Sequence, residues 1–451
     1  MEQFDLVVIG AGPGGYTGAI RAAQLGLKVA VIEKDKTLGG TCLNVGCIPS
    51  KALLHSSEYY YEAKNDFDKH GIMISDVKVN LEKMMGRKSK IVSELTGGVE
   101  FLFKKNKITW LKGLGKILTP NTVEITAADG SKSIVEAKNI TIATGSVPIE
   151  LPFLKFDEKK ILSSTGALAL DYIPKEFIVV GGGVIGLEMG SIWARLGSKV
   201  TVIEFADSIC SMMDQDCIVV LTRSMRKMGV NFMTSMKVTG SRSSGGRVEL
   251  DYESVADGKK ATIQGDVVLV STGRKAFTTG LGLENVGIVV DERGRVVTNS
   301  HLQTNVPSIF AIGDAIAGPM LAHKSEEEGV AVAEFIVTGH GHVNYNTVPS
   351  VIYTHPEVAS VGMTESECKA KGHEINVGKF PFTANARAKA KGSTEGFVKI
   401  IADKTTDTIL GAHIVSANAS ELLGELVVAM EFGGSSEDVA RSFHSHPTMS
   451  E

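Results

Sequence analysis

A unit of strand, glycine turn, helix and strand occurs twice in this chain, and it constrains the fold more than any other feature. In the first copy, residues 4–9 have the pattern of a short buried strand, and a glycine turn and a helical stretch lead to a strand ending at Glu33. The second copy ends at Glu204. Glu33 follows Gly10 by 23 positions, and Glu204 follows Gly181 by the same interval. Strands that alternate with helices in this way predict an α/β protein with two Rossmann-like domains.

The glycines of each copy have the G-x-G-x-x-G spacing typical of a dinucleotide site. The first glycine permits a tight turn, the second lets the backbone approach a pyrophosphate, and the third lets the helix pack on the strand. The helix N-terminus favours the negative charge of the phosphate. The alternative for the second copy is a decayed duplicate, which would contribute to packing but bind no nucleotide. The glycines are Gly10, Gly12 and Gly15 in the first copy, and Gly181, Gly183 and Gly186 in the second.

The acidic residue that closes each copy is placed to accept hydrogen bonds from a ribose. Motif, flanking elements and acid occur together in both copies, so we interpret them as two dinucleotide sites. Glu204 bears on which nucleotide the second site takes. A carboxylate there suits a free 2′-hydroxyl and repels a 2′-phosphate, which favours NAD over NADP.

The second informative feature is the pair Cys42 and Cys47 in the stretch GGTCLNVGCIPSKALL. Two such cysteines are most often buried thiols, and a zinc site would need more ligands than this stretch offers, so we expect no metal. Pro49 suits the first turn of a helix, which places Cys47 near a helix N-terminus, where a thiolate is stabilised. Gly46 gives the connecting turn the freedom to bring both sulfurs within bonding range. Such a disulfide beside a flavin would relay two electrons.

The chain ends in RSFHSHPTMSE, where Glu451 follows His446 by five positions. Such a pair is ordinarily a surface contact. If the carboxylate reaches the imidazole, it would set the tautomer and stabilise the imidazolium, as the acid does in a catalytic triad. His446 would then suit a general base for a thiol.

Composition excludes several classes of protein. The net charge is −4 and the pI is near 6.3, so nothing recommends nucleic acid as a partner, and no apolar run is long enough to suggest a membrane span. Five cysteines without a secretion signal argue against a structural disulfide framework. The N-terminus resembles neither a signal nor a transit peptide, so the protein stays where it is made or lacks its presequence.

Beyond about residue 340, short strands and helices predict an α+β region.

The sequence resembles the dihydrolipoamide dehydrogenase family, which belongs to the class I pyridine nucleotide-disulfide oxidoreductases. Its motifs most resemble those of the mitochondrial branch. The resemblance spans residues 5–451. The motifs that carry it are GGTCLNVGCIPSKALL, SSTGAL, GDAIAGPMLAHKSEEEG, PSVIYTHPEVASVG, GKFPFTANARAK and HSHPTMSE.

The resemblance implies an FAD-binding domain over 1–147, an NAD-binding domain over 148–274, a central domain completing the FAD site over 275–345 and an interface domain over 346–451. It implies a homodimer whose active site joins Cys42 and Cys47 of one subunit to His446 and Glu451 of the other. Each subunit would bind one FAD non-covalently, and Lys51 would place a positive charge near the flavin. The implied FAD contacts are Gly10, Gly12, Gly14, Gly15, Glu33, Lys34, Gly40, Thr41, Lys51, Gly115, Thr144, Gly145, Ser146, Asp314, Met320, Leu321, Ala322 and His323. The implied NAD contacts are Gly181, Gly183, Val184, Ile185, Gly186, Glu188, Glu204, Val238 and Gly273.

The implied reaction reoxidises protein-bound dihydrolipoamide and passes electrons through the Cys42–Cys47 disulfide and FAD to NAD. The implied partners are the lipoyl domains of 2-oxo acid dehydrogenase complexes and the H-protein of glycine cleavage. The expected compartment is the mitochondrial matrix, with the bacterial cytoplasm as the alternative. A glutathione-type reductase driven by NADPH would need basic residues after Glu204, and the stretch EFADS has none. A non-catalytic flavoprotein is disfavoured by the intact cysteine pair.

The chain departs from the family pattern at three places. Lys275 and Ala276 stand where Arg-Pro is expected, with little expected consequence. Phe443 and Ser445 replace the more usual neighbours of the two histidines, so this loop is expected to pack differently. The family continues beyond the position of Glu451 into a helical tail, which leads us to expect a shortened form.

Overall fold

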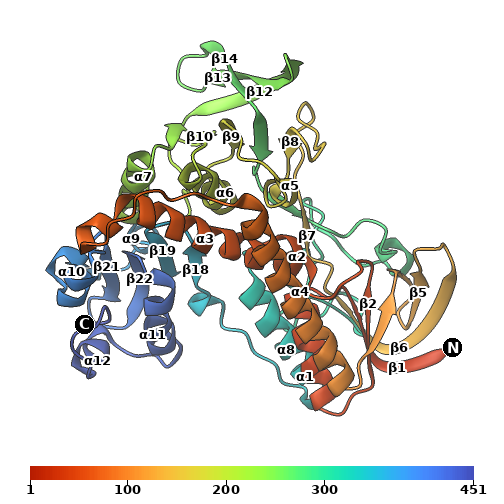
Figure 1. Ribbon diagram of the computed structural model, residues 1–451. Helices are drawn as coiled ribbons and strands as arrows, with labels where there is room; N and C mark the ends of the chain where they lie inside the picture. Colours follow the sequence, from red (N-terminus) through yellow and green to blue (C-terminus); the bar gives the residue numbers. More distant parts are fainter. The chain divides into compact units, whose positions relative to one another are not determined.

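The computed structural model describes residues 1–451 apart from the side chain of Ser244, and the chain divides into two compact units (Figure 1). The first unit holds most of the regions expected to bind FAD, and the second holds most of the expected NAD and interface regions together with residues 53–84. The first unit comprises residues 1–52, 85–149 and 273–343, and the second comprises residues 53–84, 150–272 and 344–451.

The first unit is built on a seven-stranded sheet of order β3-β2-β1-β6-β5-β4, with β17 also paired to β6. The pairs β1–β2, β1–β6, β2–β3 and β6–β17 are parallel, whereas β4, β5 and β6 form an antiparallel meander. The strands are β1 (Glu2–Ile9), β2 (Val29–Glu33), β3 (Thr109–Lys112), β4 (Leu114–Thr119), β5 (Thr122–Thr126), β6 (Lys132–Ile142) and β17 (Ile309–Ala311). A two-stranded ribbon pairs β7 (Ser146–Pro148) with β16 (Arg274–Ala276).

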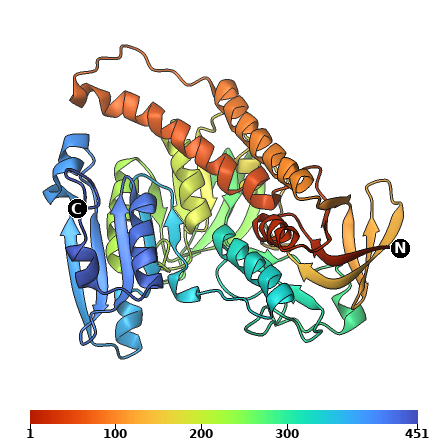
Figure 2. The same ribbon diagram turned by 90° about the horizontal axis from the view of Figure 1, so that it is seen from below.

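The central strands of this sheet are apolar because both of their faces are covered, as parallel sheets require. All five residues of β2 are buried, and one face of the sheet packs under α1 (Pro13–Gln24) and α4 (Leu81–Lys105). Helices α1 and α8 (Ala322–Thr338) lie side by side (Figure 2). Their contact is close because it is made by glycine, since a Cβ on Gly18 would lie 2.9 Å from the Gly329 carbonyl oxygen.

The second unit contains a fully parallel sheet of order β11-β10-β9-β15-β8, the counterpart of the first. Helix α6 (Val184–Arg195) follows β9, and an antiparallel meander of β12, β13 and β14 joins the sheet before β15. The elements are β8 (Ile161–Leu162), α5 (Ser164–Ala167), β9 (Glu176–Val180), β10 (Lys199–Ile203), α7 (Gln215–Lys227), β11 (Asn231–Met233), β12 (Met236–Ser244), β13 (Arg247–Ser254), β14 (Lys260–Gly265) and β15 (Val267–Val270).

The C-terminal part of the second unit is an antiparallel sheet of order β18-β19-β22-β21-β20, covered by α11. Leu423 and Leu426 of α11 pack with Ile414 of β22, which makes this region a core of its own. The elements are β18 (Ser350–Ile352), β19 (Glu357–Gly362), α9 (Glu365–Ala370), β20 (Ile375–Pro381), α10 (Ala386–Lys391), β21 (Phe397–Asp403), β22 (Ile409–Ser416), α11 (Ala419–Glu431) and α12 (Ser436–Arg441).

Two helices, α3 (Cys47–Asn65) and α4, lie between the fingerprint copies and are separated by a short 3-10 helix over Phe67–His70. The structure differs from the sequence-based expectations in two details. The strand of the second fingerprint unit ends at Ile203, one residue before Glu204. Strand β20 was not expected, since its residues are mostly exposed and lack a buried-strand pattern.

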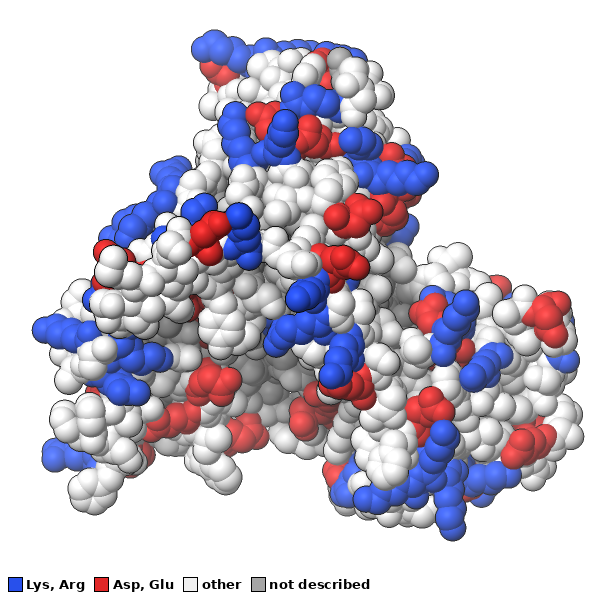
Figure 3. Space-filling model, viewed as in Figure 1, with Lys and Arg blue, Asp and Glu red and all other residues white. Residues whose placement is uncertain are grey.

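Basic and acidic side chains intermingle over the face drawn in Figure 3. Within the described residues, no helix combines the length and apolar character needed to cross a bilayer.

Candidate functional site

The first fingerprint has backbone geometry that only glycine allows. Gly10 has φ +105°, and a Cβ there would lie 2.4 Å from the Ala143 carbonyl oxygen. A Cβ on Gly15 would lie 2.0 Å from the carbonyl oxygen of Gly10. Gly12 differs, because a Cβ on it would meet nothing within 4 Å. The middle glycine therefore faces open space at the N-terminus of α1, where a pyrophosphate fits and can be held by the helix end.

The Glu33 carboxylate is aimed by two backbone amides. The Ala11 N–H donates to Oε2 and the Asp35 N–H donates to Oε1, both at 2.9 Å. Burial raises the pKa of Glu33 above the ordinary carboxyl value, against the effect of these two amides. Each oxygen keeps a lone pair for a ribose hydroxyl, so these residues fit the adenosine part of a dinucleotide.

A polar chain holds Asp314, the acid expected further along the FAD site. The Ser146 hydroxyl donates to Asp314 Oδ2 at 2.5 Å, and Arg274 Nε donates to the same hydroxyl at 2.7 Å. Burial lowers the pKa of Arg274. Thr144 donates from its hydroxyl to the Phe277 carbonyl at 2.6 Å. The turn of residues 144–146 and Asp314 are thus parts of one hydrogen-bonded group in the first unit.

Sequence reasoning missed a buried ion pair that supports this acid. Lys324 and Glu328, four residues apart on α8, are 1% and 0% exposed and lie 2.8 Å apart. Glu328 also accepts from the Gly313 N–H at 2.7 Å, and Lys324 donates to the Gly313 carbonyl at 3.3 Å. Together they hold the short 3-10 turn that presents Asp314. The signal available in the sequence was the Lys–Glu spacing of one helical turn, which usually marks a solvated face.

The other residues expected near FAD occupy several elements of the first unit. Thr41 and Lys34 are exposed, and Lys34 forms an ion pair with Asp35. Gly115 is buried in β4, where a Cβ would press on Ile9 at 3.0 Å. The residues Met320, Leu321, Ala322 and His323 surround the N-terminus of α8. Lys51 lies in the second turn of α3.

The cysteine segment, residues 39–54, packs on the first fingerprint, because the Gly39 N–H donates to the Ala11 carbonyl oxygen at 2.8 Å. Cys42 lies in α2 (Gly40–Val45), and Cys47 is the first residue of α3, as expected from Pro49. The two cysteines do not form a disulfide in this structure, and Cys47 is the more exposed. A hydrogen bond with Cys47, followed by burial, raises the pKa of Cys42 well above the usual thiol value. A Cβ on Gly46 would lie 2.8 Å from the Thr41 carbonyl oxygen, so glycine lets this turn close.

The second fingerprint repeats the geometry of the first. Gly181 has φ +106°, a Cβ on Gly186 would lie 2.2 Å from the Gly181 carbonyl oxygen, and Gly183 faces open space. Glu204 accepts from the Gly182 N–H at 2.6 Å and from the Ala206 N–H at 2.8 Å. The second copy therefore keeps both features of the first: a middle glycine that faces open space and a carboxylate oriented by backbone amides. This argues against a decayed duplicate.

The remaining residues expected near NAD belong to the second unit, except Gly273, which begins the last segment of the first unit. Val184 and Ile185 begin α6. Glu188, one turn further, is buried and accepts from the Tyr353 N–H at 3.0 Å. Val238 is buried in β12, and Gly273 adopts φ +137°.

The C-terminal pair makes the contact on which its expected role depends. His446 Nδ1 lies 2.8 Å from Glu451 Oε1, and Glu451 Oε2 accepts from the Thr448 N–H at 2.7 Å. The Thr448 amide and His446 lower the pKa of Glu451. The Nε2 side of an imidazole held in this way is free to act as a base. A second pair, His444 with Glu425 of α11, was not expected from the sequence.

Known proteins match this arrangement over its full length. Residues 4–329 match the sequence model of the family described as pyridine nucleotide-disulphide oxidoreductase, and residues 348–451 match the dimerisation domain of the same family. The chain therefore belongs to the pyridine nucleotide-disulphide oxidoreductase family, and it is an enzyme of the flavoprotein class that uses FAD and a pyridine nucleotide.

Individual relatives are similar over the whole chain. Dihydrolipoyl dehydrogenase 1, mitochondrial, of Arabidopsis thaliana is 55% identical, with 100% of this chain and 89% of the relative covered. Dihydrolipoyl dehydrogenase, mitochondrial, of Dictyostelium discoideum is 56% identical, covering 100% and 93%. Leghemoglobin reductase of Glycine max is 55% identical, covering 100% and 86%. Among solved structures, LpdA from Mycobacterium tuberculosis has a TM-score of 0.92 at 29% identity, covering 100% and 97%.

Proposed function

We propose that this protein is a dihydrolipoyl dehydrogenase, which oxidises protein-bound dihydrolipoamide and reduces NAD. The observation that carries the proposal is the attachment of the Cys42–Cys47 dithiol to an intact FAD-type fingerprint, in a chain that has a second, NAD-type fingerprint. Relatives with this name at 51–56% identity over nearly the whole chain support it.

The first unit supplies the groups proposed to hold FAD. The open Gly12 and the N-terminus of α1 suit the pyrophosphate, and Glu33 suits the adenosine ribose. Asp314, the turn of residues 144–146 and the start of α8 suit the remainder of the cofactor. When bound, FAD supplies the two-electron chemistry that connects a dithiol to a nicotinamide, and Lys51 is proposed to place its charge near the flavin.

The cysteines are proposed to exchange with the substrate. A dihydrolipoamide thiolate attacks the Cys42 sulfur of the oxidised pair, forms a mixed disulfide and displaces Cys47 as a thiolate. The second substrate thiolate then attacks the substrate sulfur of the mixed disulfide, which releases lipoamide and displaces Cys42, so that both cysteines are left as thiolates. Two electrons pass from substrate to protein, and the two substrate protons leave to bases.

His446 is proposed as the base for the substrate thiol, because the thiolate and not the thiol is the nucleophile. Glu451 orients the imidazole and stabilises its protonated form. We propose that this pair serves the cysteines of a partner subunit in a homodimer. The matched dimerisation domain supports that assembly, as do the exposed apolar side chains of Val428, Phe432 and Phe443, which are 56%, 86% and 106% exposed.

We propose a division into FAD, NAD, central and interface domains over 1–147, 148–274, 275–345 and 346–451. We also propose lipoyl domains of 2-oxo acid dehydrogenase complexes and the glycine cleavage H-protein as partners. Several of the similar relatives carry "mitochondrial" in their names, which supports the mitochondrial matrix as the compartment.

The proposal is tested by adding dihydrolipoamide to the oxidised holoenzyme and recording the flavin spectrum and NADH formation. We expect a long-wavelength absorption band as the pair is reduced, and NADH when NAD is added. Cys42→Ser and Cys47→Ser should both abolish NADH formation with FAD retained. Turnover with glutathione disulfide and NADPH, but not with dihydrolipoamide and NAD, would overturn the proposal in favour of a glutathione-type reductase.

A further inference from the structure

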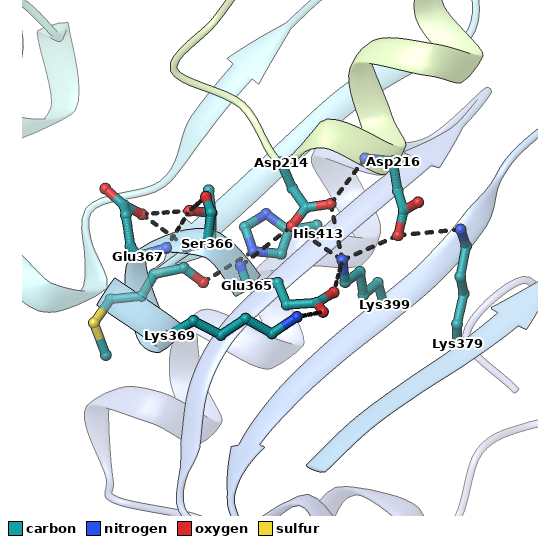
Figure 4. Close-up of polar contacts among 11 residues, drawn as sticks. Asp214, Asp216, Glu365, Ser366, Glu367, Lys369, Lys379, Lys399 and His413 are labelled. Atoms are coloured by element: carbon teal, nitrogen blue, oxygen red, sulfur yellow. Dashed lines mark hydrogen bonds and ion pairs between the residues drawn. The ribbon is translucent and has the colours of Figure 1, made fainter. Parts of the chain in front are cut away.

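A lysine is buried at the boundary between the dimerisation domain and the nucleotide-binding part of the second unit (Figure 4). Lys399 lies on β21, and its side chain is 3% exposed. Its ammonium lies 3.0 and 3.1 Å from the two oxygens of Asp214, 3.0 Å from Asp216 and 2.7 Å from Glu365. Lysines are rarely buried unless they are paired with an acid. Here three carboxylates from two other elements provide that pairing, so the folded structure compensates the buried charge.

The charges of this cluster are balanced. Lys379 of β20 lies 3.2 Å from Asp216, and Lys369 lies 2.6 Å from Glu365, so three ammonium groups face three carboxylates. Burial would lower the pKa of Lys399, but the hydrogen bonds that its ammonium donates to Glu365, Asp214 and Asp216 raise the pKa overall, which keeps the group charged. We call these six residues the Lys399 cluster.

His413 borders the cluster on β22, directly across the strand pair from Lys399. Its ring is buried, its Nε2 lies 3.0 Å from the Met363 carbonyl oxygen, and burial lowers its pKa. A neutral imidazole beside the ammonium adds no competing charge. The carboxylates of Asp214, Asp216 and Glu365 are therefore the anionic partners that the structure gives Lys399.

Asp214 connects the cluster to the nucleotide fingerprint. It is the N-cap of α7, where its side chain accepts from the Asp216 N–H at 3.1 Å, and it ends the loop of residues 205–214. That loop begins directly after Glu204. At its middle, the Cys210 N–H donates to the carbonyl of Gly182 at 3.0 Å, inside the second fingerprint. The Gly182 N–H in turn donates to Glu204 at 2.6 Å.

The loop is therefore fixed at both ends and touches the nucleotide site between them. At one end lies the carboxylate proposed to bind the ribose, and at the other lies Asp214, held by a charge from the dimerisation domain. Met213, next to Asp214, is also buried and accepts from the Ser360 hydroxyl of β19 at 3.3 Å. A displaced Asp214 would release the loop from one side, and small displacements of groups that bind a ligand weaken binding strongly.

We propose that Lys399 is a positioning residue for the nicotinamide nucleotide: it anchors Asp214 and thereby keeps the 205–214 loop, with Glu204 and Gly182, in the shape that binds the adenosine half. This inference rests on the proposed function, because it assumes that the second fingerprint binds NAD. It assigns the dimerisation domain a part in nucleotide affinity that is separate from assembly and from His446.

The test compares Lys399→Met with Lys404→Met in the FAD-loaded enzyme. Lys404 is a matched control, because it follows the same strand and forms an exposed ion pair with Glu374. For Lys399→Met we expect the KM for NAD, and its Kd measured by calorimetry, to rise about 5- to 50-fold, in the usual range for coupled sites. We expect kcat at saturating NAD and the KM for dihydrolipoamide to change less than about twofold. Lys404→Met should match wild type in all four quantities.

Removing Lys399 alone leaves Asp214 buried without its cation, which is destabilising. The double variant Lys399→Met with Asp214→Asn removes both charges and keeps a residue that caps helices well. We expect it to fold and still to show the raised KM and Kd for NAD. A folded double variant with wild-type KM and Kd for NAD would overturn the proposal, even if its melting temperature fell, because a purely structural role does not alter the KM of the folded fraction. Failure of the proposed function itself would be distinguishable, since wild type would then lack NAD-linked dihydrolipoamide turnover.

Discussion

Gly40 of the cysteine segment lies against Gly12 of the first fingerprint, so closely that a Cβ on Gly40 would fall 2.6 Å from the Gly12 Cα. Gly40 also has φ +57°, and the neighbouring Gly39 N–H donates to the Ala11 carbonyl at 2.8 Å. The segment that carries the proposed redox cysteines is thus packed directly on the turn proposed to hold the pyrophosphate. A change at this contact is expected to affect both sites.

Gly40→Ala should lower the FAD content of the purified protein. The new methyl group must displace the Gly12 backbone, and alanine at this φ adds roughly 1–2 kcal/mol of strain. The flavin-to-protein absorbance ratio and the melting temperature measure the effect. Gly86→Ala is the control, because Gly86 lies inside α4 and a Cβ on it would meet nothing within 4 Å. Alanine there should be neutral or slightly stabilising. Full FAD content in Gly40→Ala would contradict this prediction, because it would show that the protein accommodates the methyl group without disturbing the Gly12 turn.

Glu204→Ala should weaken NAD binding by roughly 0.5–3 kcal/mol, the range for a lost hydrogen bond to a charged group. It should also narrow the preference for NAD over NADP, because the carboxylate that repels a 2′-phosphate is gone. Steady-state kinetics with both nucleotides measure the change, and the KM for dihydrolipoamide is the internal control. Wild-type turnover with NADP as good as with NAD would contradict the assignment of Glu204.

In the reduced protein without FAD, iodoacetamide should alkylate Cys47 well before Cys42. Cys47 is exposed, whereas the hydrogen bond with Cys47 and burial raise the pKa of Cys42. A raised pKa keeps the thiol protonated and unreactive as pH increases, so the difference should persist to a pH of about 8.5, where an ordinary thiol is half ionised. Peptide mass spectrometry measures the rates. Cys210 and Cys217, which are buried with pKa values raised to about 12, should stay unmodified. Alkylation of Cys42 as fast as Cys47 would contradict a raised pKa for the Cys42 thiol.

His446→Gln should reduce dihydrolipoamide oxidation by roughly 10²- to 10⁴-fold, the usual contribution of a general base. Electron transfer from NADH to an artificial acceptor needs no base for a substrate thiol and should stay close to wild type. Glu451→Gln should have the same pattern with a smaller effect, because Glu451 only orients the ring. Loss of both activities together with the dimer would instead make His446 a structural interface residue.

The two fingerprints could be predicted from the sequence because each is a local structure. Strand, turn and helix follow one another within 23 positions, and the glycine spacing itself requires the positive φ angles and close backbone contacts that the structure has at Gly10 and Gly181. The helix start at Cys47 was equally predictable, because Pro49 acts on its own turn. The five-residue spacing of His446 and Glu451 also allowed their contact to be anticipated.

The features that only the tertiary structure decided join residues far apart in the chain. Lys399 meets Asp214 across 185 positions, and Gly313 is held by a Lys324–Glu328 pair that the sequence alone would place on a solvated face. No local sequence pattern indicates that a charged residue is buried, because its environment depends on which strands and helices pack beside it. Residue spacing along the chain thus determined which residues form the nucleotide and cysteine motifs. Long-range packing decided which buried residues hold those motifs in place.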